Sequence, residues 1–546
     1  MSMRTLRPVL FFCCLLSATL APAAPRAEYR GFWVDTFNST LNNQADVSAL
    51  VERAKAAKAN VLFVQVRRRG DSWYLNSLEP PPDFVPIESG FDPLQSLIQT
   101  AHLNGIEVHA FVIAGAVWNK NPAFAPTATL GPPTSAAHVF NRHGGFDPAT
   151  GRIEPGPENW LTRTLLPDGA AGIGFQGHRF GSEFWLDFGH PGAAAYTVDV
   201  LMHLVRHYDI DGLHLDRIRF PEFSAAGQTQ ASGANVGYNA VSVRRFQAFH
   251  GLPFDAPPPE PGDVRWAQWR RDQVTNLVRR VYLNAIAIRP RLVVSAALIT
   301  FGSGPTTEDA WRSAEAYWRV YQDWRAWLEE GIIDLAIPMN YKRENVAQQA
   351  AWFDQWNEWT RTHLYGRAAL SGLGVYLNSI EGSLRQVRRS LMASLPGVVF
   401  YAMANPDAAV AGNPHALPPG SDTPVRGFAE FAAALTEGKY ESPEMRPPVF
   451  AEDAVLPRLP WKAAPTTGHL MGHARSGGEP LDSAAAYIYN SEGRIERAVR
   501  ADGGGFFGAV DLPPGEYAVI VVHRDRGWVS NVLTVEAGRV AEAVFP

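Results

Sequence analysis

The sequence predicts an α/β protein: a (β/α)8 barrel followed by a C-terminal all-β sandwich. From about residue 28 to 406, a short β-rich apolar run, a polar or Gly/Pro-rich loop and an amphipathic helical stretch recur in that order. Strands that alternate with helices pair in parallel through right-handed crossovers, and eight such units close most simply into a barrel. Beyond residue 463 the runs are short and alternating, with turn residues between them, which indicates a sandwich.

The predicted barrel strands are nearly continuous apolar runs, as expected for strands that are covered on both faces. Between them, stretches such as 46–59 and 92–105 carry apolar residues at three- and four-residue spacing, which places one helix face against a sheet. The eight predicted strands span residues 29–37, 60–67, 106–115, 212–220, 291–299, 333–341, 368–376 and 397–404.

One connection is much longer than the others. It runs from about residue 116 to 190, between the third strand and a helix that begins near Pro191, and it is rich in Gly, Pro, Asn and aromatic residues. Loops of this length are usually functional or disordered. Because it follows the carboxyl end of a barrel strand, where barrel active sites are built, we expect it to form a wall or cover of a cleft.

The N-terminus resembles a cleaved secretory signal over residues 1–24. Arg4 and Arg7 precede the apolar run 9–20, and the small residues 21–24 offer a cleavage site. The run is shorter than the roughly 20 residues of a spanning helix, so we expect a periplasmic or secreted protein with no membrane span after cleavage. Both cysteines, Cys13 and Cys14, lie inside this segment, which leaves the mature chain without a disulfide or thiolate metal site.

The predicted domains follow from these patterns. The barrel covers residues 28–445, a Pro-rich linker covers 446–463, and the sandwich covers 464–546. The stretch "DGGGFFGAVDLPPGEYAVIVV" resembles transthyretin-like and carboxypeptidase regulatory-like modules, which are appended to many secreted enzymes.

The composition limits the partners. Hydrophobic residues make up 46% of the chain and charged residues 19%, which is typical of a globular protein. Acidic residues outnumber Lys and Arg by 54 to 49, a balance that argues against nucleic acid or an anionic membrane as the main partner. No phosphate-binding Gly-rich loop, GxSxG elbow or HExxH pair occurs, and we expect neither a cofactor nor a metal.

Polar and aromatic residues collect where the predicted strands end, although the strand bodies are apolar. In a parallel barrel these ends face the cleft. Amide, carboxylate and guanidinium groups interleaved with Trp and Tyr suit a sugar, which offers hydroxyls for hydrogen bonds and flat ring faces for stacking. The predicted substrate contacts are Asp35, Gln65, Arg67, Asp71, Trp118, His214, Arg219, Asn340 and Tyr341. The alternatives are an internal ion pair for Arg67 and Asp71, a hydrogen-bonded core residue for His214 and simple packing for Trp118.

Several longer stretches resemble one known family. They are "EYRGFWVDTF", "NVLFVQVRRRGDSWY", "WLDFGHPGAAAYTVDVLMHLVRHYDIDGLHLDRIRFP", "GYN", "QDWRAWLEEGIIDLAIPMNY" and "GVVFYAMAN", in this order between about Arg30 and Asn405. Together they are similar to the glycoside-hydrolase-like family ten of bacterial secreted proteins, which includes a hydrolase of denuded peptidoglycan strands. The resemblance implies a (β/α)8 barrel that acts on a polysaccharide or cell-wall glycan.

The resemblance also implies a catalytic role for Asp216 in "DGLHLDRIRF". It matches the family's fourth-strand aspartate, which related barrel glycosidases use as nucleophile or base. A buried unpaired carboxylate costs several kcal/mol or more, so Asp216 needs a partner or a use. We expect Arg219 and His214 to keep its pKa low. The alternative is that Asp216 only pairs with Arg219 and anchors the loop.

A glycosidase needs a second carboxyl group, kept protonated so that it can donate to the leaving oxygen. Our first choice is Glu222, which follows the same strand end. Asp323 resembles a family motif, although it could instead cap a helix, and Asp35 is a third candidate. The second group must lie within about 10 Å of Asp216.

The sequence therefore predicts a monomeric glycoside hydrolase that cleaves peptidoglycan strands or another envelope glycan with two carboxyl groups. The alternative is a glycan-binding envelope protein that does not cleave its ligand. A third hypothesis is a hydrolase of esters or amides on the same glycans, which needs a Ser or metal site that the sequence does not show.

Overall fold

A computed structural model describes most of the chain. No helix in the described part has the length and hydropathy needed to cross a bilayer. The predicted signal, residues 1–24, lies outside the described residues. These are 26–83, 85–119, 132–147, 152–154, 156–165, 177–222, 229–412, 426–437, 448–524 and 526–545.

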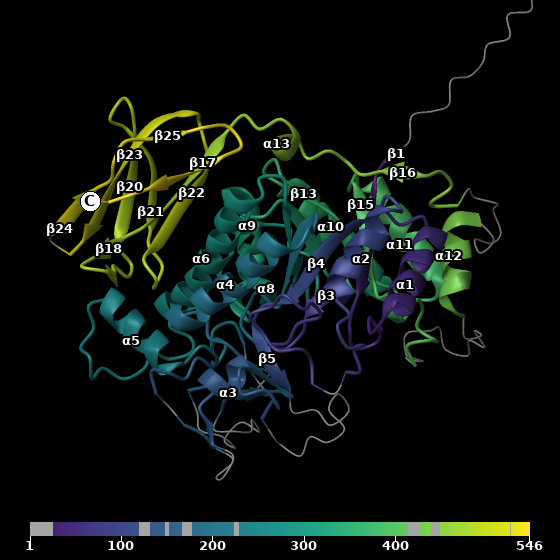
Figure 1. Ribbon diagram of the computed structural model, residues 1–546, viewed down its shortest axis with the longest axis horizontal. Helices are drawn as coiled ribbons and strands as arrows, with labels where there is room; N and C mark the ends of the chain where they lie inside the picture. Colours follow the sequence, from purple (N-terminus) through teal and green to yellow (C-terminus); the bar gives the residue numbers. More distant parts are fainter. Residues whose placement is uncertain are drawn as a thin grey trace, which may run out of the picture.

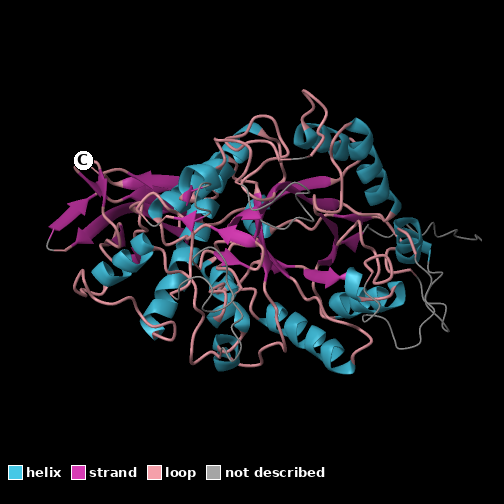
Figure 2. Cartoon of the chain, turned by 90° about the horizontal axis from the view of Figure 1, so that it is seen from below, coloured by secondary structure: helices cyan, strands magenta, loops and turns pink. Residues whose placement is uncertain are grey.

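The predicted (β/α)8 barrel is confirmed (Figures 1 and 2). Its seventh strand is in two parts, β13 (Ala368–Ala369) and β14 (Ser371–Gly374), separated by Leu370. β13 pairs with the sixth strand and β14 with the eighth, all in parallel, so the sheet returns to its start. The other strands are β2 (Tyr29–Val34), β3 (Val61–Arg67), β4 (Glu107–Ile113), β10 (Gly212–Asp216), β11 (Val293–Leu298), β12 (Leu335–Pro338) and β15 (Gly397–Tyr401).

Helices surround this sheet and bury the apolar face that their spacing predicts. In the first of them, Val47, Leu50, Val51 and Ala54 are buried, and Asn43 caps its amino end. The helices of the barrel are α1 (Gln44–Ala56), α2 (Pro93–His102), α4 (Pro191–His207), α5 (Ala240–Phe249), α6 (Val264–Ile288), α7 (Glu308–Arg312), α8 (Glu315–Trp318), α9 (Trp324–Glu330), α10 (Ala347–Thr362), α11 (Ile380–Met392) and α12 (Phe428–Glu437).

The long connection carries structure of its own. Strands β5 (Ala116–Asn119), β9 (Glu183–Trp185) and β8 (Arg179–Phe180) form a small antiparallel sheet directly after β4. The amide of Leu186 donates to the carbonyl of Gly115, which ties the end of the connection to its beginning. Figure 1 shows β5 beside the short helix α3 (Val139–His143) below the barrel.

The predicted C-terminal sandwich is also confirmed. One sheet has the order β22–β17–β26 and the other has β21–β20–β23–β24, with β25 paired to β23. Their facing sides share a core of their own that includes Ile488, Leu512 and Val519. The strands are β17 (Gly468–His473), β20 (Ala485–Asn490), β21 (Ile495–Arg500), β22 (Phe506–Leu512), β23 (Gly515–His523), β24 (Arg526–Val529), β25 (Leu533–Val535) and β26 (Val540–Ala543).

The described part of the predicted linker is docked on the barrel. Its strand β16 (Ala454–Val455) pairs with β1 (Arg26–Ala27), and its short helix α13 (Pro460–Ala463) contacts the start of β12. There the fully buried carboxylate of Asp334 accepts a bond from Trp461 Nε1 at 2.7 Å and pairs with Lys462 Nζ at 3.0 Å. The linker is therefore held by a buried ion pair, while the exact domain boundaries stay a prediction.

Candidate active site

A cleft opens at the carboxyl ends of the barrel strands. It consists of an outer cavity of about 560 Å³ and an inner cavity of about 180 Å³, which share Phe37, Arg217, Arg219 and Tyr401. The small sheet of the long connection lines the outer cavity, so this connection walls the cleft as expected. The outer cavity adds Arg69, Glu183, Trp185 and Glu222, and the inner cavity adds Trp33, Gln65, Asp216 and Tyr341.

Asp216 ends β10 and faces the inner cavity. Its Oδ1 accepts a bond from the backbone amide of Arg217 at 2.7 Å. Burial raises the pKa of the Asp216 carboxyl above 3.8, and the charges of Arg217 and Arg219 only partly oppose this effect. The expectation of a low pKa is therefore wrong, because desolvation outweighs the two cations.

Arg217 organises the charges around Asp216. Its backbone has φ 50°, a left-handed conformation that costs a non-glycine residue of order 1–3 kcal/mol. Its guanidinium forms an ion pair with Glu183, and Arg69 pairs with the same carboxylate at 3.1 Å. Burial and the neighbouring cations Arg217 and Arg68 lower the pKa of Arg69 to about 10, although Glu183 opposes them. Such crowding of cations suits a site that receives an anionic group.

Arg219 lines both cavities. Its Nη2 pairs with Glu222 Oε1 at 3.1 Å, and its guanidinium carbon lies 5.3 Å from the centre of the Trp185 ring. Its Nε is buried and has no hydrogen-bond partner among the residues that the structure describes. The Glu222 side chain is 42% exposed, so this carboxylate reaches solvent at the edge of the cleft. The structure thus brings Asp216, Arg219 and Glu222 to one cleft.

Aromatic rings form one side of the inner cavity. The Tyr341 and Tyr401 rings stack at 5.6 Å between centroids, and Trp33 meets Tyr341 edge-on at 6.2 Å. Burial and the charges of Asp35 and Asp216 raise the pKa of Tyr401, which keeps its hydroxyl protonated. Tyr341 is thus a cavity residue as predicted, and its ring offers an apolar face to a sugar.

His214 lies beneath this cavity rather than in its wall. It is fully buried, its Nε2 accepts a bond from Trp33 Nε1 at 2.9 Å, and its Nδ1 donates to Ser295 Oγ at 2.9 Å. Burial lowers its pKa well below 6.5, so the ring is neutral. Because both nitrogens are used, the expected substrate contact is wrong; His214 positions Trp33 instead.

Asp35 and Gln65 each keep one polar atom uncommitted. Asp35 Oδ1 accepts bonds from Phe37 and Asn38, whereas its Oδ2 is buried without a partner, and burial raises the Asp35 pKa. Gln65 Oε1 accepts two bonds from Thr36, and its Nε2 is buried without a partner. Gln65 lines the inner cavity, whereas Asp35 is not among the residues that line either cavity.

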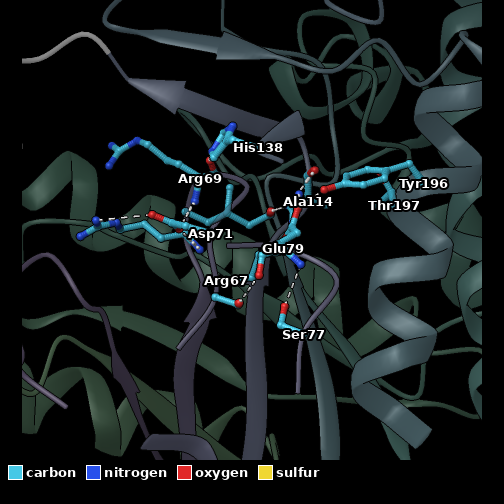
Figure 3. Close-up of polar contacts among 12 residues, drawn as sticks. Arg67, Arg69, Asp71, Ser77, Glu79, Ala114, His138, Tyr196 and Thr197 are labelled. Carbon is cyan, nitrogen blue, oxygen red and sulfur yellow. Dashed lines mark hydrogen bonds and ion pairs between the residues drawn. The ribbon is translucent and has the colours of Figure 1, made fainter. Parts of the chain in front are cut away.

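Arg67 is not a substrate contact, because its guanidinium is used inside the protein (Figure 3). It donates to both oxygens of Glu79 at 2.7 Å and also to the carbonyl of Ile113 at the end of β4. Tyr196 donates to the same Glu79 carboxylate at 2.7 Å. Both charged side chains are almost completely buried. The expected internal pair exists, but its acid is Glu79 rather than Asp71.

Asp71 shapes the loop that follows β3. Its Oδ1 accepts bonds from the backbone amides of Arg69 at 2.8 Å and Arg68 at 3.3 Å, and its side chain is almost fully buried (Figure 3). It lines neither cavity. The predicted sugar contact by Asp71 is therefore wrong, and its role is to fix Arg69 next to Glu183.

Three further predicted residues lie away from the cleft. Asp323 caps α9 and accepts a bond from Trp311 Nε1 at 3.0 Å, so the helix-capping alternative holds. Asn340 donates to the carbonyl of Phe353 on α10 at 2.9 Å. Trp118 packs edge-on against His138 within the long connection. None of the three lines either cavity.

Sequence reasoning missed several cleft residues: Phe37, Arg69, Glu183, Trp185, Arg217 and Tyr401. Arg69 did carry a signal, because it comes two residues after the predicted strand 60–67. Tyr401 lies inside the predicted strand 397–404, although it ends the observed strand β15. Glu183 carried none, because it lies in the long connection, for which the sequence predicts no strand. Trp185 opens the stretch "WLDFGHP", which belongs to the family resemblance.

Part of the chain matches a known protein family. Residues 172–385 match the model of the family Glycosyl hydrolase-like 10. This region is therefore similar to that family. This match confirms the predicted family resemblance, and the region contains Asp216, Arg219, Glu222 and Tyr341.

Curated relatives are more distant in sequence. Glycosyl hydrolase YngK of Bacillus subtilis is 23% identical over 342 residues, which are 60% of this chain and 54% of the relative. Glycosyl hydrolase DigH of Escherichia coli K12 is 23% identical over 351 residues, which are 61% of this chain and 67% of the relative. The match thus spans about half of YngK and two thirds of DigH.

Among solved structures, the PgaB (BpsB) glycoside hydrolase domain from Bordetella bronchiseptica has a TM-score of 0.46 at 15% identity, covering 71% of this chain and 97% of that one. The catalytic domain of β-amylase from Paenibacillus polymyxa has a TM-score of 0.47 at 9% identity, and the match covers 72% of this chain and 100% of that one.

The buried pair of Arg67 and Glu79 gives a stability prediction. Glu79→Gln removes one partner and leaves the other charge buried, so the free energy of unfolding falls by about 3–5 kcal/mol. Chemical denaturation measures this loss. Glu52→Gln is the control, because Glu52 is 67% exposed in its pair with Lys55 and its change stays within about 0.5 kcal/mol. Equal stabilities for the two variants would contradict the role given to the pair.

Proposed function

We propose that the protein is a glycoside hydrolase that cleaves glycosidic bonds in a polysaccharide. One observation carries the proposal: a carboxyl group with a raised pKa, Asp216, faces a cavity lined by Tyr and Trp rings and by arginines. A carboxyl group held towards its neutral form is what a general acid needs, and the rings suit the faces of a sugar. The glycosyl hydrolase-like 10 match supports the same reaction class.

The raised pKa of Asp216 changes the roles assigned from the sequence. We infer that protonated Asp216 donates its proton to the leaving oxygen, whereas Glu222 acts as the partner carboxylate from the outer cavity. Arg219 pairs with Glu222 and lines both cavities, so its charge acts on both carboxyl groups, Asp216 and Glu222. Asp35 is the alternative partner, because its Oδ2 is uncommitted. Asp323 has no part in the proposal, since it caps α9.

We infer that the substrate is peptidoglycan from which the peptides have been stripped, or another envelope glycan with carboxylates. The support is the group of three arginines, Arg69, Arg217 and Arg219, in the wall of the outer cavity. A guanidinium binds a carboxylate through two parallel hydrogen bonds, and the lactyl group of muramic acid offers one. The predicted signal over residues 1–24 supports a periplasmic or secreted location, and we propose that the protein acts there as a monomer.

A glycan-binding protein without activity is the second candidate. It is favoured by Glu183 and Glu222, which are both engaged by arginines. Asp216 argues against it. Among the described residues its side chain accepts one hydrogen bond, from the backbone amide of Arg217, and it faces the inner cavity.

Removal of the acid tests the proposal. Asp216→Asn keeps the shape of the side chain but has no proton to donate, so the rate of hydrolysis falls about 10²- to 10⁴-fold. The measurement is the release of new reducing ends from stripped glycan strands. Asp309→Asn serves as control, because Asp309 is 93% exposed and lies outside the cleft. Release by the wild type that persists in Asp216→Asn, or no release by either, contradicts the proposal.

The charge of Arg217 sets the pH dependence. Because Asp216 acts while protonated, activity is present below its pKa and falls as the pH rises through it. Arg217 lowers this pKa, so Arg217→Met raises it and shifts the alkaline limb of kcat/KM to higher pH. Arg217→Lys keeps the charge and leaves the limb near its wild-type position. A shift to lower pH in Arg217→Met would contradict the role of Asp216 as acid.

A further inference from the structure

A third cavity lies between the barrel and the sandwich, away from the cleft. It measures about 630 Å³, more than either cavity of the cleft, and shares no lining residue with them. Helices α5, α6 and the end of α9 form one wall, and strands β20, β21 and β22 form the other. Figure 1 shows these strands beside α6 and α9. Its volume is within the roughly 300–1,000 Å³ of small-molecule sites.

The two walls are held in a fixed relation by ion pairs. Arg245 on α5 donates two bonds of 2.7 Å to Asp482 of the sandwich. Arg367 binds Asp511 at 2.6 Å, and Arg280 on α6 binds Asp502 at 3.2 Å. A cavity between walls that are already fixed needs little ordering when a ligand enters, which favours binding.

Aromatic side chains lie on both walls. Phe249 is 40% exposed at the end of α5, and Trp269 lines the cavity from α6. Tyr487 faces them from β20. The small residues Ala485 and Ala498 line the cavity from the same wall as Tyr487. Flat faces with space beside them suit the stacking of a ring-shaped ligand.

Polar groups with unused bonding capacity complete the lining. Asp272 on α6 is exposed in the cavity and accepts a bond from Gln268 at 2.7 Å. Within the described part of the chain it makes no ion pair. Asn276 uses its oxygen to accept a bond from Arg279, which leaves its NH₂ group as a donor. Arg279 is itself paired with Glu330, so the wall has little net charge there. Donors and acceptors are therefore both available, and the lining as a whole carries little net charge. Four arginines and four acidic residues line the cavity: Arg245, Arg279, Arg497, Arg500, Asp272, Glu329, Glu330 and Asp511.

We propose that this cavity is a second glycan-binding site, which holds an uncharged stretch of oligosaccharide. The inference rests on the proposed function in one respect, namely that the ligand belongs to the polymer that the cleft cleaves. Because both domains build the cavity, the sandwich has a binding role and holds the polymer to the enzyme while the cleft acts. This site differs in chemistry from the arginine-lined cleft, so the two sites contact different parts of the polymer.

Two substitutions test the site in the full-length protein. Tyr487→Ala removes a ring, and Asp272→Asn changes an acceptor without altering size. The control is Tyr489→Ala, on the same strand and the same side but outside the cavity lining. The probes are stripped glycan strands immobilised on a surface, and chitotetraose, an uncharged oligosaccharide, as competitor. Equal melting temperatures of the variants and the wild type verify folding.

The expected result is a loss of about tenfold in affinity for the immobilised strands in Tyr487→Ala and Asp272→Asn, but not in Tyr489→Ala. Chitotetraose competes with the wild type, while the release of reducing ends from short soluble strands stays unchanged in all three variants. Wild-type affinity in both cavity variants overturns the inference, and the hydrolysis assay still reports on the proposed function. Loss of affinity in a protein without hydrolytic activity keeps the second site and rejects the hydrolase.

Discussion

The state of one partly buried carboxyl group, that of Asp216, is the constraint on which the site depends. Burial favours the neutral acid, whereas Arg217 and Arg219 favour the carboxylate, and burial prevails. Asp216 can thus keep its proton at a pH at which an exposed aspartate is already ionised. The left-handed backbone of Arg217 serves this balance, because it brings that guanidinium to the wall of both cavities directly after the strand ends.

Buried groups that never meet a substrate hold Asp216 in place. The pair of Arg67 and Glu79 joins the end of β3 to the carbonyl of Ile113 on β4. The next residue, Ala114, donates its amide to the carbonyl of Asp216 at 2.8 Å. Beneath the cavity, His214 supports Trp33. The polar residues at the strand ends thus fall into two groups: some hold the strand ends and loops together, and others face the cavities. Arg67 and Asp71, at the end of β3, belong to the first group.

The eight strands could be predicted because apolar runs and helical spacing are local properties of the sequence. The direction in which each side chain points at the strand ends could not be predicted in this way. Alternation places Gln65 and Arg67 on one face, but the register of β3 against β4 shifts between them, so Gln65 lines the cavity and Arg67 turns to Glu79. Arg217 does not follow the alternation of a strand, because its φ is positive. Glu183 lines the cavity from the long connection rather than from a barrel strand. The prediction of a low pKa for Asp216 was wrong, because the sequence shows which charges are near the carboxyl group but not how far it is removed from water.

Direct titration of Asp216 tests the central claim most closely. Infrared difference spectra between the wild type and Asp216→Asn, recorded across pH, isolate the carbonyl band of this single neutral carboxylic acid. Since burial raises the pKa of Asp216, the expected result is a band that is still present above pH 3.8, the ordinary pKa of an aspartate. A band that disappears at or below pH 3.8 would show that the arginines prevail over burial, and it would contradict the assignment of Asp216 as the proton donor.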